Sequence, residues 1–495
     1  MEFARKSGFH AATVVVGATV VGLALSLALV ILPASSSHAF AGWSRIPHDE
    51  VLFGGTDDVS CMSVASTPSG FVAVGRDESV TAAAVWFSTD GYTWERAVHM
   101  EGMFGGPGSQ AMWDVTAGPG NSVAVGYELT GSDHDAAVWT GGGTIWKRVA
   151  HDEAVFGGSG SQDMRAVAAS ATGVVAVGRD DSGGDSDAAV WFSEWGSNWT
   201  RIPHVEAVFG GNLNQRMWGV TAGGPGYVAV GDDGDVGAAA VWTSVDGITW
   251  SRVPHDEAVF GGPGNQIMRG VTAGGPGLVA VGGDYGGGDL DAAVWTSVDG
   301  VTWSRVPHGE AVFGGTVHQE MQDVTVGGPG LIAVGYDNDG SDRDAAVWTS
   351  VDGITWTREP HSETVFGGVE TETMNGVATG STGVVVAAGT QWAPYDTDAA
   401  VWTYTAPPPP PPPEPSPTDS GPLGPSPTTT SDVHPTATAD PTPTPSLGPK
   451  PTPGPSSEPA SSGKGGWGVG WYIGLGSVIA LVLGGLGWLW LRRRP

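Results

Sequence analysis

The sequence has little cysteine and little positive charge. Its 495 residues include one cysteine, Cys61, which excludes an intramolecular disulfide framework. Lysine and arginine together number 21 against 52 aspartates and glutamates, and the formal net charge is −31. Because such a field repels polyanions, we expect neither nucleic acid nor an anionic lipid surface as a partner.

The central part of the chain also lacks a helical period. Glycine and proline interrupt residues 42–405 about every ten residues, and no apolar stripe at a spacing of 3.6 survives between them. The chain has 80 glycines and 36 prolines in all. This pattern excludes stacked helical repeats.

In place of helices the chain contains a repeat. The tripeptide Ala-Val-Trp occurs seven times at spacings of 51 to 54 residues, ending at Trp86, Trp139, Trp191, Trp242, Trp295, Trp348 and Trp402. A Trp-x-Arg segment also occurs seven times, but its first copy, at Trp43, precedes every Ala-Val-Trp. The two sets are therefore offset by one strand.

Each period contains four strand-like runs rich in β-branched and aromatic residues. In the fifth copy these runs are Met268–Thr272, Leu278–Val281, Ala292–Thr296 and Thr302–Val306. Four strands in a period of roughly 40 to 50 residues are typical of a β-propeller blade. Because of the offset, the strand at Trp43 can complete the last sheet and remove its open edge. We predict an all-β fold, a seven-bladed β-propeller over residues 42–405 closed by its N-terminal strand.

The segments outside this array have compositions of their own. Residues 1–41 contain an apolar run after two basic residues and end in small residues, which predicts a cleaved signal peptide, with an uncleaved anchor as the alternative. Residues 406–466 are rich in Pro, Ser and Thr and predict a disordered spacer. Residues 467–491 are uncharged and mostly apolar and precede three arginines, which predicts one transmembrane helix and a cytoplasmic tail at 492–495. We therefore expect a single-pass type I protein of the cell membrane with an extracellular propeller.

A turn sequence, Ser-x-Asp-Gly-x-Thr-Trp, recurs at Ser88–Trp94, Ser244–Trp250, Ser297–Trp303 and Ser350–Trp356. We expect its glycine to take a positive φ and its hydroxyl groups to cap the turn. The motif resembles the Asp-box, or BNR, repeat of sialidase-like propellers, although that family usually has one residue between the Asp and the Gly. The resemblance covers residues 42–405 and implies the fold, while kelch-like propellers are the alternative on period length.

A His-x-Glu pair followed by Phe-Gly-Gly occurs in every copy. The pairs are His48/Glu50, His99/Glu101, His151/Glu153, His204/Glu206, His255/Glu257, His308/Glu310 and His361/Glu363. Histidine beside a carboxylate suits metal binding or acid–base chemistry. A feature that every blade repeats more often shapes a loop, so we interpret the pairs as structural and the Phe as a buried plug.

The loop before the third strand of a repeat is rich in aspartate. In the sixth copy it supplies Asp337, Asp339, Asp342 and Asp344 around a glycine. Hard oxygen ligands of this kind suit calcium, the only cofactor that the sequence suggests. The spacing is not that of an EF-hand, and turn-forming aspartates in contact with solvent are the alternative.

The best candidates for a binding site are the positions at which the repeats differ. Directly after the Met or Cys of each innermost strand stand Met62, Trp113, Arg165, Trp218, Arg269, Gln322 and Asn375. We expect these residues to ring one mouth of the central channel, on the face with the acidic loops, where Trp392 and Tyr395 add aromatic rings. Such a surface suits a sugar; packing against neighbouring loops is the alternative.

These features predict a non-enzymatic, surface-displayed module that binds a glycan or a protein. The family resemblance implies one alternative, an extracellular sialidase-like glycosidase, which needs an arginine cluster, a Tyr nucleophile paired with Glu, and an acidic Asp. Arg165, Arg216 and Arg269 are placed to cluster, but the sequence assigns no Tyr/Glu pair beside them and no catalytic residue. An architectural cell-wall protein is the second alternative, because the fourth to sixth repeats are nearly identical.

Overall fold

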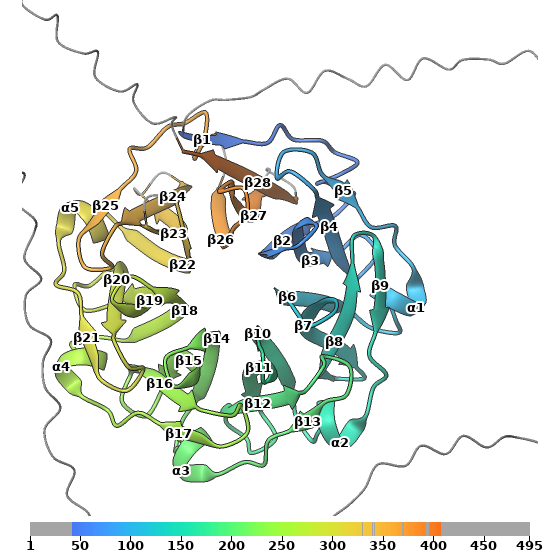
Figure 1. The fold of residues 1–495 in the computed structure, drawn as a ribbon, viewed down its shortest axis with the longest axis horizontal. Helices are drawn as coiled ribbons and strands as arrows, with labels where there is room; N and C mark the ends of the chain where they lie inside the picture. Colours follow the sequence, from blue (N-terminus) through green and yellow to red (C-terminus); the bar gives the residue numbers. More distant parts are fainter. Residues whose placement is uncertain are drawn as a thin grey trace, which may run out of the picture. The chain divides into compact units, whose positions relative to one another are not determined.

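The computed structural model describes residues 42–406 except 329, 339, 341, 369–370 and 393–395. Over this part of the chain the strands form seven four-stranded sheets, which surround a common centre (Figure 1). The predicted all-β, seven-bladed propeller is confirmed. The predicted signal peptide, spacer and C-terminal helix lie outside the described residues. Within the described residues no helix is both long and apolar enough to cross a membrane.

The sheets are antiparallel meanders, and we number the blades 1 to 7 by their innermost strands. These strands are β2 (Val59–Thr67), β6 (Gln110–Ala117), β10 (Gln162–Ser170), β14 (Gln215–Gly223), β18 (Gln266–Gly274), β22 (His318–Gly327) and β26 (Glu372–Thr379). The second strands are β3 (Gly70–Asp77), β7 (Ser122–Thr130), β11 (Gly173–Asp180), β15 (Gly226–Asp233), β19 (Gly277–Asp284), β23 (Gly330–Asn338) and β27 (Val385–Trp392).

The outer half of each blade holds the repeated tryptophans. The third strands are β4 (Ala82–Ser88), β8 (Asp133–Gly142), β12 (Asp187–Ser193), β16 (Ala238–Ser244), β20 (Asp291–Ser297), β24 (Arg343–Ser350) and β28 (Thr397–Thr405). The outermost strands are β5 (Glu95–Arg96), β9 (Ile145–Arg148), β13 (Thr200–Arg201), β17 (Trp250–Arg252), β21 (Trp303–Arg305), β25 (Trp356–Arg358) and β1 (Gly42–Arg45). The two inner strands of blade 5 are longer than predicted, since their pairing extends as far as Gly274 opposite Gly277.

The core lies between adjacent blades. In β11, Val174 and Ala176 pack toward blade 2, whereas Val175 and Val177 pack toward blade 4. All four side chains are completely buried. A strand covered on both faces needs apolar residues at successive positions, and the β-branched valines suit this environment. The unbroken apolar run Val-Val-Ala-Val in the sequence therefore reflects a strand that is buried on both of its faces.

The tryptophan of each Ala-Val-Trp tripeptide joins its strand to the perimeter of the propeller by a hydrogen bond. Trp191 is fully buried, and its Nε1 donates a hydrogen bond of 2.7 Å to the Val155 carbonyl. Val155 belongs to one of the one-turn helices that the described part of the chain forms at the perimeter (Figure 1): α1 (Glu101–Phe104), α2 (Glu153–Phe156), α3 (Glu206–Phe209), α4 (Glu257–Phe260) and α5 (Glu310–Phe313). Phe156 is 4% exposed, which confirms the phenylalanine of this segment as a buried plug.

The turn after the third strand has the predicted geometry. In blade 4, Gly247 has a φ of +77°. The Asp246 carboxylate accepts hydrogen bonds from the backbone N–H groups of Ile248 at 2.8 Å and Thr249 at 2.7 Å. The equivalent backbone hydrogen bonds lower the pKa of Asp299 to about 2. The aspartate therefore holds the turn as an anion.

The ring closes between the two ends of the repeat array. Strand β1 pairs with β28, from Gly42 opposite Thr405 to Arg45 opposite Trp402. The Trp43 ring lies 5.5 Å from that of Tyr404, centroid to centroid. Every strand of the seven sheets comes from residues 42–405. This segment therefore contains every strand that closure of the ring requires.

Candidate functional site

A β-bulge interrupts each innermost strand at the position where the repeats differ. In β10 the register with β11 shifts between Met164 and Ala166, and the same shift occurs in the other six blades. A bulged residue is left out of the ladder, which redirects its side chain. The bulged residues are Met62, Trp113, Arg165, Trp218, Arg269, Gln322 and Asn375, and all of them line one central cavity of about 320 Å³.

The residue before each bulge anchors it in the core. Met164 is completely buried, and Cys61, which takes this place in blade 1, is 1% exposed. Burial raises the pKa of the Cys61 thiol well above its ordinary value. Cys61 is therefore part of the hydrophobic core.

The three arginines that the sequence placed near one another meet at a single indole ring. The guanidinium carbons of Arg165, Arg216 and Arg269 lie 5.3, 5.3 and 5.0 Å from the Trp218 ring centroid. Arg165 also lies over Trp113, at 4.5 Å. Cation–π contacts therefore join blades 2 to 5 around the channel mouth.

Each of these arginines already has a carboxylate partner. Arg216 Nη2 lies 2.9 Å from Asp232 Oδ2, and Arg269 Nε lies 2.8 Å from Glu320 Oε1. Arg165 Nη2 lies 3.0 Å from Asp163 Oδ2. The cluster is therefore close to neutral, and an incoming anion would have to compete with groups already in place.

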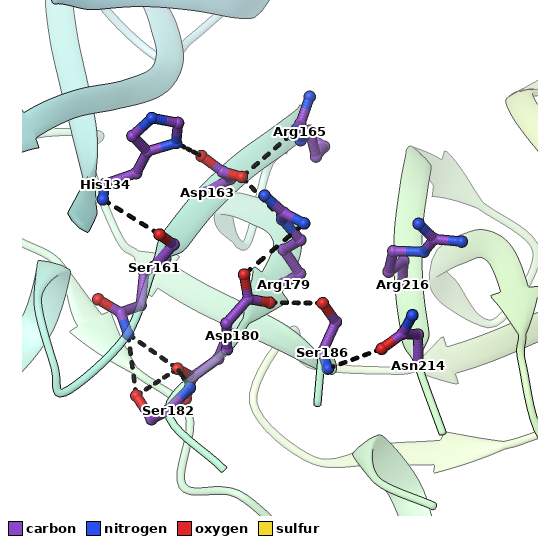
Figure 2. Close-up of polar contacts among 12 residues, drawn as sticks. His134, Ser161, Asp163, Arg165, Arg179, Asp180, Ser182, Ser186, Asn214 and Arg216 are labelled. Atoms are coloured by element: carbon purple, nitrogen blue, oxygen red, sulfur yellow. Dashed lines mark hydrogen bonds and ion pairs between the residues drawn. The ribbon is translucent and has the colours of Figure 1, made fainter. Parts of the chain in front are cut away.

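Asp163 joins blades 2 and 3 (Figure 2). It is fully buried, accepts a hydrogen bond of 2.8 Å from Arg179 Nε, and lies 3.3 Å from His134 Nδ1 on blade 2. Burial by itself would raise the pKa of Asp163, but the contacts with His134, Arg165 and Arg179 outweigh it and hold this pKa well below its usual range. Asp163 is therefore a buried anion at the channel rim.

The structure adds a second variable layer that the sequence reasoning missed. It consists of the residue two positions before each bulge and its cross-strand partner. These pairs include Asp163 with Arg179, Arg216 with Asp232, and Glu320 with Tyr336. The sequence does indicate this second layer, because the residue before the Met or Cys varies among repeats as much as the residue after it.

Blade 6 contains the Tyr/Glu pair that the sequence analysis did not assign, and this corrects that interpretation. The Tyr336 hydroxyl donates a hydrogen bond of 3.1 Å to Glu320 Oε2, and Glu320 is 4% exposed. The Arg343 guanidinium lies over the Tyr336 ring, 4.0 Å from its centroid. Burial and the neighbouring Glu320 carboxylate raise the pKa of Tyr336 well above its usual value. The phenol is therefore held in its protonated form.

A groove adjoins the channel mouth over blades 1, 6 and 7. Its volume is about 740 Å³, and it shares Met62, Gln322 and Asn375 with the central cavity. Trp392 lines this groove and is 57% exposed. Tyr395, the other aromatic residue predicted there, lies outside the described residues.

The described members of the predicted calcium loop face different surroundings. Asp337 forms an ion pair with Arg358 and accepts a hydrogen bond of 2.7 Å from Gln319 Nε2. Asp344 lies 3.7 Å from His361 Nδ1, and Asp342 lines the groove. Asp339 lies outside the described residues. Calcium binding at this loop stays a prediction.

Two aspartates line the channel itself. Asp114 accepts hydrogen bonds from Ser63 Oγ at 2.6 Å and from the Val167 N–H at 2.7 Å, so it connects blades 1, 2 and 3. Asp323 accepts a hydrogen bond of 2.9 Å from the Val377 N–H of the next blade. Burial raises the pKa of Asp114 to about 6 and that of Asp323 to about 7. These carboxyl groups titrate between weakly acidic and neutral pH.

The strand pairing and the rim define the class of protein, a seven-bladed β-propeller with a polar, aromatic channel mouth. No family model matches the chain, and no curated protein matches it. Among solved structures, Trypanosoma rangeli sialidase is 12% identical with a TM-score of 0.41, over 74% of this chain and 60% of that one.

Two further solved structures are similar to this chain. The α-L-arabinofuranosidase Arb93A from Fusarium graminearum is 12% identical with a TM-score of 0.39, over 73% of this chain and 98% of that one. Sqt1 from Chaetomium thermophilum is also 12% identical with a TM-score of 0.39, over 73% of this chain and all of that one. At these identities the similarity concerns the fold alone.

Proposed function

We propose that this protein is a non-enzymatic binding module whose site is the channel mouth together with the adjoining groove. The proposal rests on the bulged residues: the Met or Cys before each of them is buried in every blade, whereas the bulged residues are of five different kinds and converge on one cavity. Polar and aromatic side chains of different kinds that converge on a concave surface are typical of a ligand site.

The proposed ligand is a glycan, with a surface protein as the other candidate. Sugars bind through aromatic faces with polar groups beside them. Trp392 offers an exposed indole in the groove, and Arg76, Asp342 and Arg343 line the same groove. The faces of Trp113 and Trp218 already contact guanidinium groups, so we assign first contact with the ligand to Trp392.

The test is a glycan-array assay on residues 42–406, run with calcium and with a chelator. Saturable binding that Trp392→Ala weakens strongly and Trp113→Ala weakens less would support the proposal. The matched control is Trp195→Ala, because Trp195 is 66% exposed in a turn at the opposite end of the strands. An array without binding would contradict the glycan assignment and leave a protein ligand or an architectural role.

The Tyr336–Glu320 pair favours a second candidate, a glycoside hydrolase. The pair lies beside Arg269, whose Nε also donates to Glu320. Against this candidate stand the raised pKa of Tyr336 and the carboxylate partners of the arginines. Turnover of a panel of fluorogenic glycosides, lost in both Tyr336→Phe and Arg269→Ala, would establish hydrolysis and overturn a purely binding role.

We further propose that the propeller is displayed outside the cell on a single membrane anchor. The supporting observations are the apolar run in residues 1–41, the proline-rich segment 406–466, and the apolar segment 467–491 before three arginines. Protease treatment of intact cells should release a fragment the size of the propeller. Protection of the propeller from protease would contradict this topology.

Calcium at the blade 6 loop is proposed with the binding site, because Asp342 lines the groove. Ligand binding that a chelator weakens in the wild type but no longer changes in the Asp342→Asn variant would support it.

The four Ser-x-Asp-Gly-x-Thr-Trp turns are proposed to be of the Asp-box type. In each of them the aspartate carboxylate accepts two backbone hydrogen bonds, as Asp352 does from Ile354 and Thr355.

A further inference from the structure

The perimeter of blade 2 brings one histidine and two carboxylates to a common point. Nε2 of His151 lies 3.3 Å from Glu153 Oε2 and 3.8 Å from Asp135 Oδ2. Asp135 lies in β8, His151 follows β9, and Glu153 begins α2. Equivalent sets are Asp291 with His308 and Glu310 in blade 5, and Asp398 with His48 and Glu50 in blade 7.

Asp135 is a buried carboxylate that lacks a hydrogen-bond donor among the residues the structure describes. Asp135 is 4% exposed. The nearest side-chain nitrogen of a Lys, Arg or His residue is His151 Nε2, and its distance of 3.8 Å is too long for a hydrogen bond. The Asp135 side chain is 6% exposed, so little water can replace the missing hydrogen bonds, and burying the anion in this way is costly. Its oxygen faces the same point as His151 and Glu153, which is where a cation would satisfy it.

A second carboxylate, that of Glu128, lies on the Nδ1 side of the His151 ring and orients it. Nδ1 of His151 lies 3.3 Å from Glu128 Oε1, and Glu128 is itself held by Arg148. When Nδ1 donates its proton to Glu128, the lone pair of Nε2 points at the oxygens of Asp135 and Glu153. Metal-binding histidines commonly have a carboxylate in this position. In this tautomer Nε2 has no proton of its own to offer Glu153, so the three electron-rich atoms repel one another unless a proton or a metal cation lies between them.

We propose that blade 2 binds a divalent transition-metal ion of the zinc class through His151 Nε2, Asp135 and Glu153, and that blades 5 and 7 carry equivalent sites. Ligands about 2.0–2.1 Å from a tetrahedral ion lie about 3.4 Å apart, close to the separations seen here. An imidazole with two carboxylates suits Zn²⁺ or Co²⁺ better than calcium, and it leaves a position for water. The net charge of −31 adds a field that attracts cations.

The other blades provide internal controls. Blades 1 and 4 contain the pairs His99/Glu101 and His255/Glu257 but have Ala82 and Ala238 in place of Asp135. In blade 3 the two carboxylates face different ring nitrogens, since His204 Nδ1 is near Asp187 and its Nε2 is near Glu206. Blade 6 has the same divided arrangement. We therefore expect three sites rather than seven.

The proposal is tested by titrating residues 42–406 with Zn²⁺ in a calorimeter and with Co²⁺ by visible absorption. The wild-type protein should bind about three ions, and the triple variant Asp135→Ala/Asp291→Ala/Asp398→Ala should bind none in a saturable way. The control variant His99→Ala/His255→Ala should bind as the wild type does. Alanine at the substituted position already occurs in blades 1 and 4, so the triple variant is compatible with the fold.

Two further variants separate metal ligands from structural residues. The side chains of Glu50, Glu153 and Glu310 are 66%, 71% and 74% exposed, so changing all three to Gln should remove binding without affecting the fold. In a background with only the blade 2 site intact, Glu128→Gln should weaken Zn²⁺ binding about 10- to 100-fold. The absence of saturable binding, an equal loss in the control variant, or binding of Ca²⁺ as tight as that of Zn²⁺ would each overturn the proposal.

Discussion

The guanidinium group of Arg165 lies over the indole ring of Trp113, with 4.5 Å between the guanidinium carbon and the ring centroid. The two residues come from the bulges of adjacent blades. Arg165 is held in addition by the buried Asp163. Because these contacts exist in the free protein, the rim of the channel is assembled before a ligand binds, which reduces the ordering cost of binding.

Replacing Asp163 by Asn should lower the free energy of unfolding by about 2–4 kcal/mol, because Arg165 and Arg179 would lose a fully buried charged partner. Denaturant unfolding at neutral pH measures this loss. The matched control is Asp181→Asn, since Asp181 also pairs with Arg179 but is 29% exposed, and we expect a change of about 0.5 kcal/mol or less. Because the pKa of Asp163 is lowered, its contribution is present above the unfolded pKa and is lost as the pH falls. Equal effects of the two variants would contradict the prediction.

Lowering the pH from about 8 to about 5 should increase the stabilising contribution of the channel aspartates. The pKa of Asp114 is raised to about 6 and that of Asp323 to about 7, so the folded protein binds these protons more tightly than the unfolded chain does. The contribution is complete below the unfolded pKa near 4 and is lost as the pH rises through about 6 to 7.

The variant Asp114→Asn/Asp323→Asn should remove this pH dependence, on the order of 1 kcal/mol or more for each residue. Urea unfolding at the two pH values gives the difference for wild type and variant. Asp57→Asn, at an exposed position, is the control and should leave the difference unchanged. A double variant with the full wild-type pH dependence would refute the assignment.

Replacing Trp295 by Phe should cost about 1–3 kcal/mol of unfolding free energy. The indole is fully buried, and its Nε1 donates a hydrogen bond of 2.7 Å to the Val259 carbonyl, which phenylalanine cannot replace. Chemical denaturation measures the loss. Trp195→Phe, at a 66% exposed position, should change stability by about 0.5 kcal/mol or less.

Removing residues 42–45 should destabilise the propeller and promote self-association. The deletion exposes the edge of β28, and it removes the Trp43 contact with Tyr404 and the Arg45 ion pair with Glu372. Thermal unfolding and size-exclusion chromatography with light scattering report the two effects. A shortened protein that stays monomeric with unchanged thermal stability would show that closure by β1 is dispensable.

Local sequence features predicted the architecture because they repeat. The tryptophan spacing, the Asp-Gly turns and the offset of Trp43 each depend on residues close in sequence or on simple counting. The positive φ of Gly247 and the pairing of β1 with β28 follow from them. The bulged residues were also found from the sequence, because they are the positions at which an otherwise regular repeat changes.

Contacts between blades were decided only by the tertiary structure. The sequence alone determined the seven repeats, their turns and the residues that differ among them, since these depend on short-range pattern. It did not determine that three arginines meet at Trp218, that Tyr336 bonds Glu320, or that Glu128 lies behind His151. These contacts depend on strand register, on the bulges and on ring closure, which together set where each side chain points.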